Sequence, residues 1–212
     1  MKLAVIGAAG KTGSQVVRQA LDRGHEVVAV ARSPEKLDVA GGRLTVVAAD
    51  VRDADALTRA VAGCEATVTT FGAAAGRQPT DLYSVGITHV LQAIDAGSVR
   101  RLAVISASPA GPRSEQPAAL RLLVLPILDR FFGAVYADLR RMEAVLARRG
   151  DLEWACLRPP RLLDRPATGR YRTGPKPLPG TRSLSYPDLA TALLDCVDGA
   201  EPPSGMLYVA GG

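Results

Sequence analysis

Three glycines near the N-terminus are spaced three residues apart, in the stretch AVIGAAGKTG. Gly7 would allow the chain to turn sharply out of a strand. Gly10 has no side chain that would keep a diphosphate away from the backbone, and Gly13 would let a helix pack closely on the strand. The first turn of such a helix offers unpaired N–H groups and a positive dipole end to phosphates. We therefore expect these glycines, with Lys11 and Thr12 between the last two, to bind a dinucleotide. The alternative is an ordinary glycine-rich turn.

The second apolar run ends in VAVARSPEKL, and its last residues bear on which dinucleotide binds. Sites that prefer NAD usually carry an acidic residue there for the ribose hydroxyls, whereas this chain has Arg32 and Ser33. A guanidinium can bind a 2′-phosphate through two hydrogen bonds, and a serine hydroxyl can donate a further hydrogen bond to the same phosphate. The stretch therefore favours NADP(H) over NAD. In the alternative interpretation Arg32 is a surface residue and Ser33 caps a short helix that begins at Pro34.

Apolar runs of strand length alternate with helical patterns from one end of the chain to the other. Strands are predicted at 3–7, 25–32, 43–50, 65–72, 100–108, 152–160 and 205–212, and helices at about 11–23, 53–63, 82–96, 136–149 and 187–198. Such alternation indicates βαβ units and a parallel sheet, and right-handed crossovers place helices on both faces. We expect an α/β protein with a single Rossmann-like doubly wound parallel sheet, formed by one domain over residues 1–212.

Two irregular stretches are expected on the substrate side of this domain. The first is an insert at about 109–135. Its apolar segment, 117–136, is interpreted either as a helix buried on the core or as a wall over an aromatic substrate. The second is a Pro/Gly/Arg-rich loop at about 159–182. The arginines in and beside it (Arg158, Arg161, Arg165, Arg170 and Arg172) could attract an anionic substrate or could be solvated surface residues.

Composition excludes several other classes of protein. The net charge is +5, but the basic residues are spread along the chain, so no nucleic-acid partner is expected. No apolar run is long enough to span a membrane, and the first residues do not resemble a signal peptide. The three cysteines have no metal-ligand spacing, so we expect no metal and a reducing, cytoplasmic location.

Several motifs together resemble the atypical short-chain dehydrogenase/reductases, within the NAD(P)H-binding group that includes flavin reductase/biliverdin-IXβ reductase and NmrA-like proteins. These motifs are GAAGKTG, ARSPEKL, ADVRD, VISAS and MEAVLARRGDLEWACLRPPRLLDRPATGRYR. The resemblance implies a Rossmann-like fold with the cofactor across the carboxyl ends of the strands. It also implies that Asp50 and Val51 lie by the adenine, and that Phe71 and Gly72 line the nicotinamide ribose side.

The same resemblance directs attention to Ser106 at the end of the fifth strand and Tyr136 at the start of a helix. In short-chain dehydrogenases that reduce carbonyls, a serine and a tyrosine polarise the carbonyl, and a lysine four residues after the tyrosine lowers its pKa. Here that position is Arg140, which is bulkier and does not deprotonate. Tyrosine-based proton transfer by Ser106, Tyr136 and Arg140 is therefore in doubt.

The flavin reductase-like members imply a different chemistry, in which hydride passes to a stacked flavin, quinone or tetrapyrrole and solvent supplies the proton. The leading expectation is an NADPH-dependent reductase acting on a planar aromatic small molecule, as a monomer or homodimer. Two alternatives stay open. One is a ketone reductase or biosynthetic tailoring enzyme that uses Ser106 and Tyr136, and the other is an NmrA-like regulator that binds NADP without turnover.

Overall fold

A computed structural model describes residues 1–72, 78–116, 118, 120–180 and 183–211. The strands are β1 (Lys2–Ile6), β2 (Glu26–Ala31), β3 (Leu44–Ala48), β4 (Ala66–Thr69), β5 (Arg101–Ile105), β6 (Glu153–Arg158), β7 (Arg161–Leu163), β8 (Tyr171–Gly174), β9 (Ser183–Ser185) and β10 (Gly205–Gly211). The α-helices are α1 (Lys11–Asp22), α2 (Ala54–Val61), α3 (Leu82–Asp95), α4 (Leu125–Leu146) and α5 (Tyr186–Asp195). Short 3-10 turns η1 (Pro34–Lys36), η2 (Ser108–Ala110) and η3 (Arg113–Glu115) and a π-helix η4 (Leu120–Val124) complete the described part.

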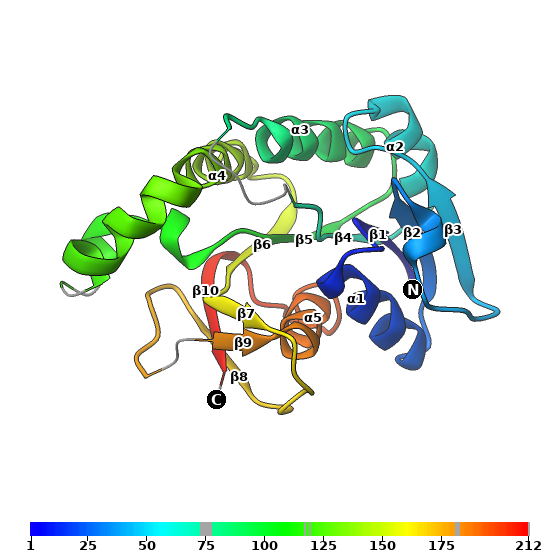
Figure 1. Ribbon diagram of the computed structural model, residues 1–212. Helices are drawn as coiled ribbons and strands as arrows, with labels where there is room; N and C mark the ends of the chain where they lie inside the picture. Colours follow the sequence, from blue (N-terminus) through cyan, green and yellow to red (C-terminus); the bar gives the residue numbers. More distant parts are fainter. Residues whose placement is uncertain (73–77, 117, 119, 181–182, 212) are drawn as a thin grey trace.

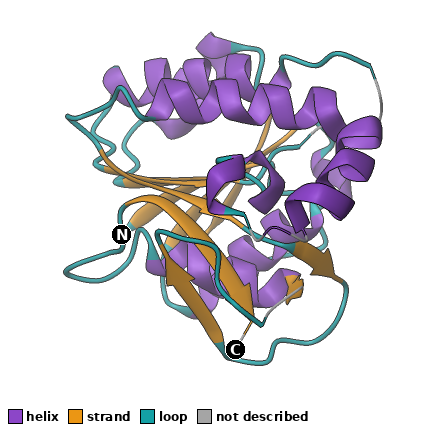
Figure 2. Ribbon diagram, turned by 90° about the vertical axis from the view of Figure 1, so that its left-hand side faces the viewer, coloured by secondary structure: helices purple, strands orange, loops and turns teal. Residues whose placement is uncertain are grey.

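The strands of the described chain form an eight-stranded sheet in the order β3-β2-β1-β4-β5-β6-β10-β8. Every pairing in it is parallel except that of β10 with β8. The sheet separates two helical layers, with α2, α3 and α4 on one face and α1 and α5 on the other (Figures 1 and 2). The expected Rossmann-like α/β fold is therefore confirmed.

Each face of the sheet buries its own apolar cluster because the strands alternate their side chains between the faces. On β1, Ala4 and Ile6 contribute to the cluster under α2, α3 and α4, whereas Leu3 and Val5 contribute to the one under α1 and α5. Burial on both faces explains why the central strands read as continuous apolar runs.

The insert differs from the expectation of irregular structure. Helix α4 begins at Leu125 rather than near Tyr136, with proline in its first turn, where the missing N–H costs no hydrogen bond. Its N-terminal half and η4 extend beyond the sheet in Figure 1. The large apolar side chains exposed there are Leu122, Leu123, Val124, Ile127 and Phe131. This part of the insert is therefore a helix that packs on the core along one side only, because Leu125 is buried and Phe132 packs against the core cluster. Pro117 and Ala119 lie outside the described residues.

The stretch predicted as a loop at 159–182 contains two short strands. β8 pairs antiparallel with β10, and β7 pairs in parallel with β9 as a separate ribbon. Each strand has four residues or fewer, too few to show a periodicity that sequence analysis could use. Residues 181 and 182 of that stretch lie outside the described chain.

Candidate functional site

A cleft of about 240 Å³ opens where β1, β2, β3 and β4 end. Its walls come from the glycine turn after β1, the segment after β2, and the residues that follow β3 and β4. The lining residues are Ile6, Gly7, Ala9, Gly10, Val30, Ala31, Arg32, Ser33, Lys36, Ala49, Val51, Thr70, Phe71, Gly72 and Leu82. Seven of the predicted cofactor contacts are among them: Gly7, Gly10, Arg32, Ser33, Val51, Phe71 and Gly72.

The turn after β1 is built around the left-handed backbone of Gly7, whose φ is +90°. The N–H of Gly7 donates to the Val30 carbonyl at 2.8 Å, which ties the turn to β2. The Gly7 carbonyl accepts from the Thr70 hydroxyl at 3.0 Å and from the Gly10 N–H at 3.1 Å. A Cβ atom on Gly7 would lie 2.5 Å from the Phe71 nitrogen, so no other residue fits there without displacing β4's end.

The start of α1 fits a diphosphate. Gly10 precedes the helix, and a Cβ on it would meet only the Gly7 oxygen, at 3.3 Å, within 4 Å. The first turn, all of which the structure describes, carries no acidic side chain. The first N–H groups of an α-helix have no carbonyl partner within the helix, and the positive end of the helix dipole lies beside them, which is a favourable arrangement for phosphate oxygens.

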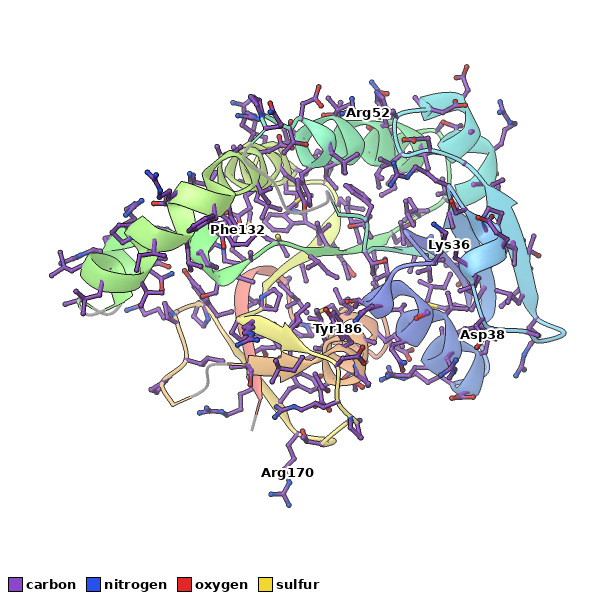
Figure 3. The ribbon with its side chains drawn as sticks, in the orientation of Figure 1. Lys36, Asp38, Arg52, Phe132, Arg170 and Tyr186 are labelled. Atoms are coloured by element: carbon purple, nitrogen blue, oxygen red, sulfur yellow. The ribbon has the colours of Figure 1, made fainter. Side chains whose placement is uncertain are left out.

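Basic and hydroxyl groups gather at the other end of the cleft. Arg32 and Ser33 line it, and Ser33 makes no side-chain cap bond to the η1 turn that it precedes. Lys36, on η1, is a third lining residue that sequence analysis missed, although it lies three residues beyond Ser33 in the same motif (Figure 3). Asp50 faces this group with its carboxylate 4.0 Å from Arg32 Nη1.

Val51, Phe71 and Gly72 form the apolar wall of the cleft. A Cβ on Gly86 would lie 2.9 Å from both the Phe71 ring and the Val51 side chain, so this glycine lets α3 press against that wall. The Phe71 ring also lies 6.3 Å, centroid to centroid, from that of Tyr83 on α3. The wall is thus supported by the helix behind it.

Lys11, Thr12 and Gly13 lie beside the cleft without lining it. The Lys11 ammonium contacts Asp164 at 2.8 Å and lies 5.4 Å from the centre of the Tyr186 ring, which connects α1 to the segment after β7. Thr12 is buried, and Gly13 packs against the glycine turn.

Ser106 lies directly after β5, buried, in a network of three side chains from three elements. Its hydroxyl contacts Glu143 Oε1 of α4 at 2.6 Å. Arg158, the last residue of β6, holds both oxygens of that carboxylate, with Nε 2.9 Å from Oε1 and Nη2 2.8 Å from Oε2. Burial lowers the pKa of Arg158, but the hydrogen bonds and charge of Glu143 outweigh that effect and raise it. The interpretation of Arg158 as a solvated loop residue was wrong.

The face of Arg158 is covered by Tyr208 of β10, whose ring centre is 5.2 Å from the guanidinium carbon. The Tyr208 hydroxyl donates to Glu115 at 2.9 Å, and Gln116 donates to it at 3.4 Å. A Cβ on Gly111 would lie 2.1 Å from the Tyr208 hydroxyl oxygen, so a larger residue at this position would clash with the tyrosine. The sequence pointed to Ser106 and included Arg158 among the loop arginines, but nothing in it predicted Glu143 or Tyr208 as their partners, because these residues are far from Ser106 in the chain.

Tyr136 and Arg140 have surroundings unlike those of a tyrosine and its activating cation. Tyr136 is buried, and the centre of its ring lies 6.1 Å from the centre of the Phe132 ring. Phe132, labelled in Figure 3, packs against the core. Burial and the charge of Asp129 raise the pKa of Tyr136. Arg140 is exposed on α4. Neither feature favours a tyrosinate near neutral pH.

A cleft formed by a glycine turn at the carboxyl ends of parallel strands is typical of dinucleotide-binding proteins. The NAD(P)H-binding family matches residues 7–200, and the chain belongs to that family. Among curated proteins, YwnB of Bacillus subtilis, which is uncharacterised, is 29% identical over 205 residues, covering 92% of this chain and 91% of its own.

Solved structures share the fold at low sequence identity. The oxidoreductase ylbE from Lactococcus lactis aligns with a TM-score of 0.82 at 17% identity, over 100% of this chain and 91% of its own. A candidate NADH-flavin reductase from Streptococcus pneumoniae aligns with a TM-score of 0.77 at 24% identity, over 100% of both chains. ChuY, an anaerobillin reductase from Escherichia coli O157:H7, aligns with a TM-score of 0.79 at 20% identity, over 100% and 97%. Across the part of this chain that the structure describes, no helix is long and apolar enough to cross a membrane.

Proposed function

We propose that the protein is an NADPH-dependent reductase that passes hydride to a flavin or another planar aromatic acceptor. The observation that carries the cofactor preference is the group formed by Arg32, Ser33 and Lys36 at one end of the cleft. Two cations and a free hydroxyl suit a 2′-phosphate, and β2 is followed by an arginine where NAD sites usually carry an acid.

The residues of the cleft would divide the binding of NADPH between them. The glycine turn and the first turn of α1 would hold the diphosphate, because the first N–H groups of a helix lack carbonyl partners within the helix. Val51 and Phe71 would supply apolar contacts to the rings. The chemistry that the cofactor supplies when bound is the donation of a hydride from its nicotinamide ring.

The surroundings of Tyr136 support a planar acceptor over a ketone. Reduction of a ketone needs a proton for the developing alkoxide, which calls for an acid tuned near the working pH. The pKa of Tyr136 is raised rather than lowered, and Arg140 is exposed. A reduced flavin or tetrapyrrole can take its proton from solvent, so the protein needs only to orient two rings and exclude water. The structural neighbours from S. pneumoniae and E. coli, named as a flavin reductase and an anaerobillin reductase, favour the same class.

The test is an acceptor panel assayed by loss of NADPH absorbance, with FMN, riboflavin, a quinone, biliverdin and several ketones. We expect turnover with one of the planar acceptors, faster with NADPH than with NADH. Turnover confined to ketones would contradict the proposal and favour a ketone reductase. Tight NADP⁺ binding by calorimetry with no turnover on any acceptor would instead identify a nucleotide sensor. The variant Gly10→Val is the control, because a side chain at that position would obstruct the diphosphate.

A further inference from the structure

Ser106 and Phe71 follow neighbouring strands at the same edge of the sheet. The strands β4 and β5 pair in parallel as far as Thr69 and Val104, Phe71 follows the end of β4, and Ser106 follows the end of β5. Phe71 lines the cleft. Ser106 therefore lies one strand further along the same carboxyl edge, where a ligand that extends beyond Phe71 would arrive.

The charge state of Glu143 decides what Ser106 can offer such a ligand. Arginine stays protonated in proteins, and Arg158 engages both oxygens of Glu143 in a two-pronged contact. Glu143 is accordingly a carboxylate, and a carboxylate only accepts hydrogen bonds. The contact of 2.6 Å is therefore one in which the Ser106 hydroxyl donates, and its length is typical of O–H···O⁻ bonds.

A hydroxyl has one proton and two lone pairs, so Ser106 keeps only acceptor capacity for anything else. We propose that Ser106 acts in the site as a hydrogen-bond acceptor that recognises an amide or imide N–H of the bound ligand. This inference rests on the proposed function, because it takes the ligand to be a nicotinamide cofactor together with a planar acceptor. It also implies that Ser106 does not polarise a ketone by donating to its oxygen.

Glu143 and Arg158 are positioning residues in this scheme. Glu143 orients the hydroxyl, and Arg158 holds both oxygens of the Glu143 carboxylate in place. Tyr208 stacks on the guanidinium and fixes its plane. Ser106, Glu143 and Arg158 are all buried, so solvent does not compete for the Ser106 proton.

The N–H could belong to the carboxamide of the cofactor or to the acceptor, and two measurements separate these sources. The first compares the affinity of NADP⁺ with that of its 3-acetylpyridine analogue, which keeps the carbonyl but has a methyl group in place of the amide nitrogen. If the cofactor is the source, calorimetry should show roughly three- to tenfold tighter binding of NADP⁺, the worth of one hydrogen bond. Ser106→Ala should abolish that difference.

The second measurement compares lumiflavin with 3-methyl-lumiflavin, in which the imide N–H is methylated. Quenching of flavin fluorescence in the presence of NADP⁺ gives both affinities. If the acceptor is the source, the methylated ring should bind more weakly to the wild-type protein, and Ser106→Ala should reduce the difference. A difference that persists in Ser106→Ala is steric and does not support Ser106 as the acceptor.

The positioning role is tested with the double variant Glu143→Leu/Arg158→Met, which replaces the ion pair with apolar groups. Such replacements of buried pairs are often tolerated, and thermal melting serves as the control for folding. Ser106 would then be free to donate, so its preference for the N–H ligand should fall. Retention of the full preference would contradict the role of Glu143.

The proposal is overturned if Ser106→Ala leaves both preferences unchanged while NADP⁺ still binds. Absence of NADP⁺ binding in the wild-type protein would overturn the proposed function along with it, so the two failures are distinguishable.

Discussion

The Cα atom of Gly13 lies so close to Gly7 that a Cβ atom on Gly13 would be 2.2 Å from the Gly7 carbonyl oxygen. The same Cβ would be 2.7 Å from the Thr70 hydroxyl, which donates to that oxygen. Helix α1 therefore packs directly onto the turn whose backbone shapes the cleft, and a glycine is required at the contact.

The first prediction follows from this contact. Gly13→Ala should destabilise the protein by about 2–4 kcal/mol, because the methyl group would force α1 off the turn. Gly10→Ala is the matched control, since its Cβ would lie 3.3 Å from the same oxygen and faces the cleft. We expect Gly10→Ala to melt near the wild-type temperature but to bind NADP⁺ more weakly. Equal melting temperatures for the two variants would contradict the packing argument.

The second prediction concerns the choice of cofactor. Arg32→Ala should weaken NADPH binding by about 1.5–3 kcal/mol more than NADH binding, because a charged hydrogen bond to the 2′-phosphate is lost. Asp50→Asn should strengthen the preference for NADPH over NADH, since it removes a negative charge 4.0 Å from the Arg32 guanidinium. Titration calorimetry with both cofactors measures the ratio of the NADPH and NADH dissociation constants for each variant. Equal losses for NADPH and NADH in Arg32→Ala would show that this side chain does not contact the phosphate.

The third prediction separates the two kinds of reduction. Tyr136→Phe should leave kcat within about tenfold of the wild-type value, whereas removal of a general acid costs about 10²–10⁴-fold. The reason is that burial and Asp129 raise the Tyr136 pKa, which leaves the phenol a poor proton donor near neutral pH. The measurement is kcat with NADPH and the best acceptor of the panel, after cofactor affinity has been shown to be unchanged. A hundredfold loss would point to carbonyl reduction instead.

The fourth prediction concerns stability in acid. Asp188, buried in the first turn of α5, accepts hydrogen bonds from the Thr168 and Gly169 N–H groups and from the Ser185 hydroxyl. Burial raises the pKa of its carboxyl, but these bonds outweigh it, and the net pKa is lowered. The carboxylate therefore stabilises the fold above the unfolded-state pKa of about 3.9, and this contribution is lost as pH falls through the folded value.

Asp188→Asn should accordingly lower the free energy of unfolding at neutral pH and make its decline in acid shallower. Urea unfolding at several pH values between neutral and about 3 gives the comparison. Asp38→Asn is the control, because that side chain is exposed and points away from the core (Figure 3). If Asp188→Asn and Asp38→Asn gave the same acid profile, the stabilising role of the Asp188 carboxylate would be wrong.

Sequence alone was sufficient for the alternating elements and for the glycine turn. The apolar runs of strand length, the helical patterns between them and the spacing of the glycines are local features, so each predicts its own structure without knowledge of the rest of the fold. The motif after β2 likewise placed Arg32 and Ser33 at the cleft, because short connections after parallel strands open at one edge of the sheet.

Tertiary structure alone decided the surroundings of Ser106. Its partners Glu143 and Arg158 come from a helix and a strand that are distant in sequence, and nothing local marks a glutamate on an amphipathic helix as the one that turns inward. In the sequence, Arg158 is one of several arginines in or beside a predicted loop. In the structure, the pairing of β5 with β6 places it near Ser106. The Ser106 hydroxyl donates its proton to Glu143, in a network that joins the end of β5 to α4 and β6. Such a network forms only when the sheet and its helices have assembled.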